Sequence, residues 1–273
     1  MIRLDDIAIR RGGVDLMTGV SFTMQPGSVY AVIGPNGAGK TSLLRAIFGD
    51  LPLSAGAITV GKDRLTAAGG RRFREPRRWR DRFAYMPQDT HLDVALTVLE
   101  VVVLGRLGRL GLHVDDATLA LATERLREAG ILHLADRYIS TLSGGQRQMA
   151  LFAQVLMREP MAMLLDEPVS ALDLRHQIHL LDLVRRETRK RNLTTAVVLH
   201  DLNLACQFAD RIVVLRPGGL SAFGPPQEVM TAELIAETYR ARVEILRDSC
   251  GRPVIQPLGE MGDAVSGAEG REP

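Results

Sequence analysis

The segment GPNGAGKT, residues 34–41, has the residue types and spacing of a phosphate-binding loop. It matches the pattern G-x-x-x-x-G-K-[ST] and lies between an apolar run and a helix-like segment. The glycines let backbone N–H groups turn toward a phosphate, Lys40 supplies a cation for the β- and γ-phosphates, and the Thr41 hydroxyl can bind Mg²⁺. The alternative, a glycine-rich surface loop, is disfavoured because the strand and the helix are both present. This segment, called the glycine loop below, therefore predicts a nucleotide site.

Polar residues also follow three apolar runs that read as strands. Asp166 and Glu167 come directly after one run, His200 ends a second, and Gln88 follows a third. Ligands bind beyond the carboxyl ends of parallel strands, so these side chains are expected near the glycine loop. Asp166 suits Mg²⁺, Glu167 suits orienting and deprotonating the attacking water, His200 is a candidate donor to the γ-phosphate, and Gln88 is a candidate sensor of water or Mg²⁺. Taken alone, each could be an ordinary strand-end residue.

The segment TLSGGQRQMA, residues 141–150, predicts a second phosphate-binding turn. Ser143 occupies an N-cap position, and Gly144 and Gly145 leave the first backbone N–H groups of the following helix accessible. Such a helix start is an anion site. A plain capped helix is the alternative interpretation of these residues.

The elements that must position these residues alternate between strand and helix. Apolar runs at 28–33, 81–86, 161–165 and 194–199 predict strands of a largely parallel sheet in an α/β fold. The stretch from about 92 to 158 is helix-like and predicts a helical insertion. The first thirty residues predict short antiparallel strands. From about Asp248 the content of Gly, Ser, Pro and Glu predicts a loosely held or disordered end.

Composition is that of an ordinary globular protein. The 273 residues are 46% hydrophobic with a net charge of +2, so no global field favours nucleic acid. Two cysteines predict no disulfide framework and fit a reducing cytosol. The charged N-terminus predicts no signal peptide, and the longest apolar run is too short to span a bilayer.

Two smaller features have alternative interpretations. The segment 71–82 holds seven arginines in twelve residues, which predicts either a solvated, partly helical excursion or, less favoured, a nucleic-acid contact with Trp79 stacked on a base. An acidic partner loop or anionic lipid would be other partners for it. His176 and His179 lie three residues apart on a predicted helix, where surface positions are favoured over a metal site.

Taken together, the motifs resemble those of the ATP-binding cassette (ABC) ATPases. The resemblance covers about residues 3–245 and includes the glycine loop, Gln88, LSGGQ, DEP followed by SALD, and the strand-end His200. It implies a P-loop NTPase core with a helical subdomain and a small antiparallel β subdomain, with an ABC ATPase domain at 1–245 and a partly disordered segment at 246–273. It implies ATP and Mg²⁺ as cofactors. The residues implied to contact nucleotide are Gly34, Pro35, Asn36, Gly37, Ala38, Gly39, Lys40, Thr41, Ser42, Arg11, Ser143, Gly144, Gly145, Gln146 and Asp173.

The resemblance also explains why one chain has two phosphate-binding turns. In this family two chains face each other, and the LSGGQ turn of one contacts the γ-phosphate of ATP held by the other. Ser143 and Gly145 would act in trans, Asp173 would communicate across the interface, and Gln88 would link the site to a transmembrane partner. Arg11 stands where the family usually has an aromatic residue that stacks on adenine. A guanidinium plane can also stack on a base.

Further segments resemble one group of importer subunits. These are LTVLEVVVLGRLGRLG (96–111), SALDLRHQ (170–177) and GPPQEVMTAELIAETY (224–239), which is usually followed by a short strand-bearing segment. The resemblance implies a peripheral ATPase subunit on the cytoplasmic face of the inner membrane, paired with a second copy of the chain and a permease, and served indirectly by a periplasmic binding protein. The expected cargo is a ferric siderophore, with haem or cobalamin as alternatives. A soluble ABC protein acting on nucleic acid is the alternative from another class.

Overall fold

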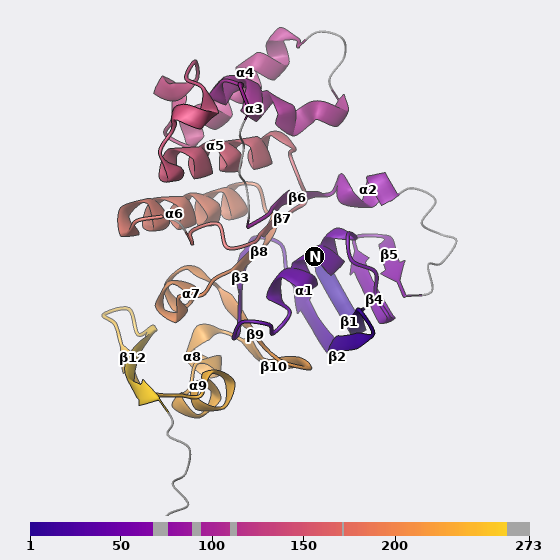
Figure 1. Cartoon of the computed structure of the whole chain (residues 1–273), viewed down its shortest axis with the longest axis vertical. Coiled ribbons are helices and arrows are strands. Elements are labelled where there is room, and N and C mark those ends of the chain that lie inside the picture. Colours follow the sequence, from indigo (N-terminus) through magenta and orange to yellow (C-terminus); the bar gives the residue numbers. More distant parts are fainter. Residues whose placement is uncertain (68–75, 89–93, 110–113, 171, 261–273) are drawn as a thin grey trace, which may run out of the picture.

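The computed structural model describes residues 1–67, 76–88, 94–109, 114–170 and 172–260. A six-stranded sheet runs through the middle of the molecule, with a smaller antiparallel sheet beside it and a group of helices at one end (Figure 1). The predicted α/β fold with a helical insertion and a small antiparallel β subdomain is confirmed.

The central sheet has the strand order β10-β9-β3-β8-β7-β6, in which only the β10–β9 pair is antiparallel. Alternate residues of β3 enter different cores, so Ala31 packs on one face of the sheet and Tyr30 on the other. Burial on both faces explains why these strands are continuous apolar runs in the sequence. The six strands are β3 (Ser28–Ile33), β6 (Phe83–Met86), β7 (Ala162–Leu165), β8 (Thr194–Val198), β9 (Arg211–Arg216) and β10 (Gly219–Gly224).

One face of the central sheet packs against helix α1 (Lys40–Phe48) and the antiparallel sheet. In that sheet β1 pairs with β2, as predicted for the antiparallel N-terminal strands, and it pairs also with β4. The short helix α2 (Pro76–Arg80) leads into β6. The antiparallel sheet consists of β1 (Ile2–Arg11), β2 (Val14–Met24), β4 (Ala55–Val60) and β5 (Asp63–Thr66).

The opposite face packs against helices, among them α6 (Leu174–Lys190) and α7 (Leu202–Phe208). The predicted helical insertion contains, among its described residues, α3 (Val98–Val103), η1 (Leu104–Arg109), α4 (Asp116–Glu128), η2 (Leu132–Leu134), η3 (Ile139–Thr141) and α5 (Gly144–Met157). Figure 1 shows α5 lying along α6, between α6 and the other helices of the insertion.

An ion cluster joins the end of α4 to the end of α6. Glu128 accepts hydrogen bonds from Arg125 at 2.7 Å, from Lys190 at 2.7 Å and from Arg191 at 3.0 Å. Arg191 also donates to the fully buried Glu187 at 2.8 Å. Because the charges are paired, their burial between the two helices is tolerated. The cluster fixes α4 on the helix that packs against the central sheet.

The C-terminal part comprises α8 (Pro226–Val229), α9 (Ala232–Tyr239) and a hairpin of β11 (Ala241–Arg247) and β12 (Pro253–Glu260). The predicted strand-bearing segment is therefore confirmed, and the predicted domain boundary at 245 falls within β11. The structure differs from the loose end expected from about Asp248, because β12 pairs with β11 and the backbone of Ile255 bonds Asn203 in α7 at 2.7 and 3.3 Å. Residues 261–273, also predicted to be disordered, lie outside the described residues.

Candidate ATP-binding and hydrolysis site

The glycine loop connects β3 to α1 in a conformation that requires glycine at two positions. Gly34 has φ 151°, and a Cβ there would collide with the carbonyl oxygen of Leu215. Gly39 has φ 91° and occupies the N-cap of α1, where no side chain bonds the free N–H groups of the first turn. Those N–H groups and the positive end of the helix dipole therefore face the loop, as an anion site requires.

Lys40 lies within this loop and is only 6% exposed. Its Nζ donates hydrogen bonds to the carbonyl oxygens of Gly34 at 2.8 Å and Pro35 at 3.0 Å. Burial lowers the pKa of the Lys40 ammonium, and the nearby charges of Glu167 and Asp166 act in the opposite direction. The loop thus holds a cation together with the uncapped helix start, and both favour a bound phosphate.

Asp166 lies at the end of β7 and is 1% exposed. Its Oδ1 accepts a hydrogen bond from the Thr41 hydroxyl at 3.1 Å, and its Oδ2 accepts one from the Tyr85 hydroxyl at 3.3 Å. Burial raises the pKa of the Asp166 carboxyl, while these two hydrogen bonds lower it. A carboxylate and a hydroxyl are oxygen ligands of the kind Mg²⁺ prefers, so Thr41 and Asp166 fit the predicted metal.

Glu167 is held between two side chains from neighbouring strands. Gln88 Nε2 donates to Glu167 Oε2 at 2.7 Å, and His200 Nε2 lies 2.6 Å from Glu167 Oε1. The strand order β8-β7-β6 explains this meeting, because His200 follows β8, Glu167 follows β7 and Gln88 follows β6. Glu167 has φ 50°, a left-handed backbone that turns the chain at this point. The structure thus brings together the three residues predicted to be catalytic, with His200 on Glu167 itself.

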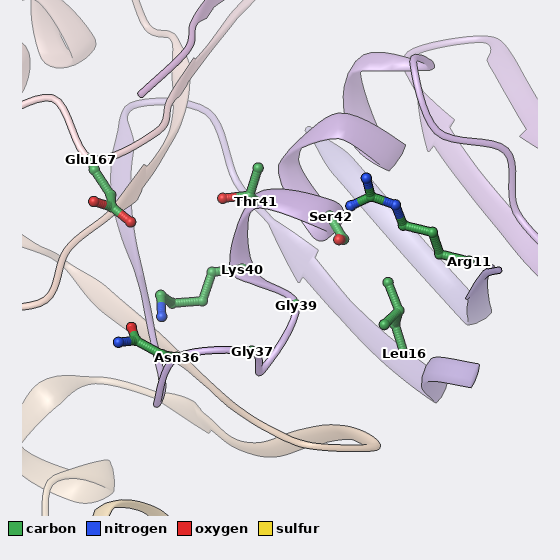
Figure 2. A pocket seen from close by; sticks show the side chains of 9 residues that line it. All are labelled: Arg11, Leu16, Asn36, Gly37, Gly39, Lys40, Thr41, Ser42 and Glu167. Carbon is green, nitrogen blue, oxygen red and sulfur yellow. The ribbon is translucent and has the colours of Figure 1, made fainter. Parts of the chain in front are cut away.

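A pocket of about 300 Å³ opens over the glycine loop. In Figure 2 the side chains of Lys40, Thr41 and Glu167 lie on one side of it, and Arg11 and Leu16 lie on the other. Arg11 comes from the end of β1 and Leu16 from β2, so the antiparallel sheet forms the wall where a base would lie. The remaining lining residues are Asn36, Gly37, Gly39 and Ser42.

The second predicted turn starts helix α5. Ser143 and Gln146 form a capping box, in which each side chain bonds the other residue's backbone N–H at 3.3 and 3.2 Å. A Cβ at Gly145 would lie 3.0 Å from the ring of His176, so only glycine fits without a shift of that ring. Asp173 caps α6 through the backbone N–H of His176 at 2.9 Å. None of these residues lines the pocket over the glycine loop.

The helices that begin at the two predicted phosphate-binding turns pack on opposite faces of the central sheet. Helix α1 contributes Leu43 and Leu44 to the core on one face, whereas α5 contributes Met149 and Phe152 to the core on the other. Figure 1 shows the same separation. The predicted contact of the LSGGQ turn with nucleotide is therefore not made within this chain's own pocket.

The described part of the arginine-rich segment does not fit the nucleic-acid interpretation. Trp79 is 2% exposed and donates from Nε1 to the Ile47 carbonyl at 2.9 Å. Arg80 bonds the Gly49 carbonyl at 3.0 Å, and Arg82 pairs with Asp63. The Trp79 ring cannot stack on a base because it packs under α1. Residues 71–75 lie outside the described residues.

The metal interpretation of the two helix histidines also lacks support. His176 Nδ1 bonds Asp173 Oδ1 at 2.8 Å. Across the part of the chain that the structure describes, no group of three or more His, Cys, Asp or Glu side chains could hold a metal ion.

Two residues of the site were missed in the sequence. Tyr85 bonds Asp166, and Leu16 lines the pocket beside Arg11. Both are apolar or aromatic residues within strands, so their local pattern indicates only core packing. Leu16 lies a few residues beyond the turn at Gly12 and Gly13, which is the one signal that could have placed it near the site.

The fold and the site define a P-loop nucleotide-binding protein, and comparison with known proteins gives the family. The model of the ABC transporter family matches residues 17–170. The hemin import ATP-binding protein HmuV of Rhodopseudomonas palustris (strain HaA2) is 39% identical over 254 residues, which cover 90% of this chain and 93% of that protein. The ferric enterobactin transport ATP-binding protein FepC of Escherichia coli (strain K12) is 34% identical over 271 residues, which cover 97% of each.

Solved structures agree with this assignment at the level of the fold. A metal-chelate type ABC transporter in an inward-facing conformation superposes with a TM-score of 0.80 at 24% identity, covering 94% of this chain and 97% of that chain. A dimeric bacterial ABC transporter cassette superposes with a TM-score of 0.72 at 25% identity, covering 82% and 98%. This chain belongs to the ABC transporter family and binds ATP. None of its described helices is long and apolar enough to cross a membrane.

Proposed function

We propose that this chain hydrolyses ATP to power import of an iron chelate through a partner permease. The observation that carries the proposal is the position of Glu167, which lies between Gln88 and His200 at the rim of the glycine-loop pocket. A carboxylate oriented by two neighbours beside a phosphate site is suited to activate water.

The phosphate groups are bound by the glycine loop. The uncapped N-terminus of α1 supplies backbone N–H donors, and Lys40 exchanges its bonds to the Gly34 and Pro35 carbonyls for bonds to phosphate oxygens. Thr41 and Asp166 would hold Mg²⁺, which neutralises phosphate charge when bound. Arg11 and Leu16 would pack against the base.

Glu167 accepts a proton from the attacking water. Gln88 and His200 keep its two oxygens in fixed directions, so one lone pair can face the pocket. Because His200 stands against Glu167, we assign it first to orienting that carboxylate. The contact of His200 with the γ-phosphate stays a prediction.

A second chain would complete the site. Ser143, Gly144, Gly145 and Gln146 form a helix start that does not line this chain's own pocket, so we propose that they contact ATP held by another copy. Asp173 would communicate across that interface. A dimeric cassette of this family superposes with the chain, which supports a paired arrangement.

The cargo proposal rests on the relatives. Those compared above carry the names of hemin import and ferric enterobactin transport proteins, so a ferric siderophore and haem both stand as candidate cargoes. Cobalamin remains an alternative within the same group of importers. The subunit would lie on the cytoplasmic face of the inner membrane, bound to its permease through the region of Gln88, with a periplasmic binding protein delivering the cargo.

Glu167→Gln tests the ATPase assignment. The amide keeps the shape of the side chain but cannot take a proton, so hydrolysis should fall by about 10²–10⁴-fold while ATP affinity is retained. Glu244→Gln, an exposed change in β11, is the matched control. Steady-state hydrolysis and calorimetry measure the two quantities. Near-normal turnover in Glu167→Gln would remove Glu167 from this role.

Uptake by intact cells tests the cargo. Cells lacking this chain would be given labelled ferric siderophores, haem and cobalamin, with the wild-type, Glu167→Gln or Glu244→Gln chain restored. Loss of one uptake, recovered with wild type and Glu244→Gln but not with Glu167→Gln, would identify the cargo. Unchanged uptake of all three would contradict the cargo proposal and leave the ATPase assignment standing.

A further inference from the structure

Asp166 is held at both oxygens, and only one of its two partners belongs to the glycine loop. Thr41 donates to Oδ1 from the start of α1, and Tyr85 donates to Oδ2 from β6. A carboxylate with one anchor can rotate about its Cβ–Cγ bond. With a second anchor on the other oxygen, that rotation is blocked and the direction of the remaining lone pairs is fixed.

Tyr85 is itself held in place by stacking. Its ring lies 5.1 Å from the ring of Phe48, with 24° between the planes. Phe48 is the last residue of α1, the helix that begins at Lys40, and its ring also meets Phe83 edge-on at 6.3 Å. The aromatic contacts therefore join the far end of the phosphate-binding helix to the strand that carries Tyr85.

The Tyr85 hydroxyl can act only as the donor in its hydrogen bond to Asp166. The Tyr85 hydroxyl lies 3.3 Å from Asp166 Oδ2, and an ordinary tyrosine hydroxyl, with a pKa of about 10, is protonated at neutral pH. The phenol therefore keeps its proton, and it donates while the carboxylate accepts. A hydrogen bond to a charged acceptor is stronger than one between neutral groups.

We propose that Tyr85 is a positioning residue that fixes the Asp166 carboxylate for Mg²⁺. This inference rests on the proposed function, because it takes Asp166 and Thr41 as the residues that hold the metal. Tyr85 does not line the glycine-loop pocket. It acts by limiting the orientations of Asp166, so its loss weakens the response to Mg²⁺ and leaves metal-free nucleotide binding intact.

Tyr85→Phe separates this role from packing. Phenylalanine keeps the ring that stacks on Phe48 and removes only the hydroxyl that bonds Asp166. The matched control is Tyr30→Phe, which also removes one buried hydroxyl, here the acceptor of the Gln25 N–H at 2.6 Å, and keeps the stacking on Phe223. Tyr30 lies in the core on the same face of the sheet and does not line the pocket.

The experiment uses the full chain and ATP. Calorimetry measures ATP affinity in EDTA and across a Mg²⁺ titration, and hydrolysis is measured across the same titration. We expect the half-saturating Mg²⁺ concentration of Tyr85→Phe to rise about tenfold in both readouts. Its ATP affinity in EDTA should equal that of wild type, and Tyr30→Phe should match wild type throughout.

The possible outcomes separate the inference from the proposed function. A Tyr85→Phe chain with wild-type Mg²⁺ dependence, or a Tyr30→Phe chain with the same shift, would overturn the inference alone. A wild-type chain that binds ATP in a Mg²⁺-dependent way without hydrolysing it would overturn the proposed function, and the calorimetric shift would still support the role of Tyr85. A wild-type chain whose nucleotide binding ignores Mg²⁺ would overturn the inference and the metal assignment together.

Discussion

Glu167 takes its orientation from two side chains that lie about 80 and 30 residues away along the chain. Gln88 and His200 each occupy one of its oxygens, at 2.7 and 2.6 Å. Only the parallel order of β8, β7 and β6 makes the three residues neighbours. Any change to one partner therefore alters the geometry of the carboxylate without removing it.

We expect His200→Ala to lower the hydrolysis rate constant by about a hundredfold, because a misplaced catalytic group costs about that much. ATP affinity should change little, since His200 does not line the glycine-loop pocket. Single-turnover hydrolysis and calorimetry measure the two effects. A large loss of affinity with unchanged hydrolysis would show that the imidazole contacts the nucleotide and does not act through Glu167.

Arg11 is expected to bind purines without distinguishing them. A guanidinium plane can stack on either purine ring, so Arg11→Ala should weaken ATP and GTP binding equally, by about fivefold. Arg10→Ala is the control, because Arg10 pairs with Asp15 at 3.2 Å and does not line the pocket. Calorimetry with both nucleotides would reveal a base preference if Arg11 contacts one purine specifically.

At the scale of elements, the parts predicted best are those defined by local pattern. The strand at 28–33, the glycine loop and the helix after it match the structure closely, because a buried strand, a glycine motif and the start of a helix each depend on adjacent residues. Tyr85 and Leu16 could not be found in this way. Their roles depend on which strand lies beside which, and strand order is set by packing over the whole chain.

The ion cluster between α4 and α6 makes a prediction at this scale. Burial raises the pKa of Glu128, but the hydrogen bonds from Lys190 and Arg125 outweigh it, so the pKa lies below the ordinary 4.5. Glu128→Gln should cost about 2 kcal/mol of stability at neutral pH, because hydrogen bonds to a charged group are lost. The melting temperature should fall by a few degrees.

The pH dependence of that effect has a definite sign. A carboxylate whose pKa is lower in the folded chain stabilises it fully above the unfolded pKa, and the stabilisation is lost as pH falls through the folded value. The difference in melting temperature between wild type and Glu128→Gln should therefore be full at pH 7 and shrink below about pH 4.5. Glu124→Gln, in which the lost carboxylate is exposed and 3.8 Å from Arg125, should show no such difference.

At the scale of the whole molecule, the two phosphate-binding turns predict that the working unit contains two chains. Lys40→Ala would disable the glycine loop. Ser143→Asp would place a negative charge against the phosphate, and Asp remains a good N-cap, so α5 should still form. In an equal mixture of the two variants, half of the randomly formed pairs would contain one chain of each kind. Such a pair holds one intact site, made of the glycine loop of the Ser143→Asp chain and the LSGGQ turn of the Lys40→Ala chain.

Because half of the pairs hold one of two possible sites, we expect the mixture to hydrolyse ATP at up to about a quarter of the wild-type rate. That rate should exceed the summed hydrolysis rates of the two variants measured separately. Hydrolysis would be measured after the chains are mixed in the complex with the permease. Two differently tagged copies, purified through both tags, provide the mixed pair alone. A mixture no more active than the separate variants would show that the LSGGQ turn serves its own chain's nucleotide.

Trp79 gives this protein an internal optical signal. It is the single tryptophan of the chain, its indole is buried against Phe83, and its Nε1 bonds the last turn of the phosphate-binding helix at Ile47. A buried indole emits at shorter wavelength than one in water. Its fluorescence therefore reports whether α2 stays packed on α1. Stopped-flow mixing with nucleotide would follow the contact between these two helices in the unlabelled chain, because no second tryptophan contributes to the signal.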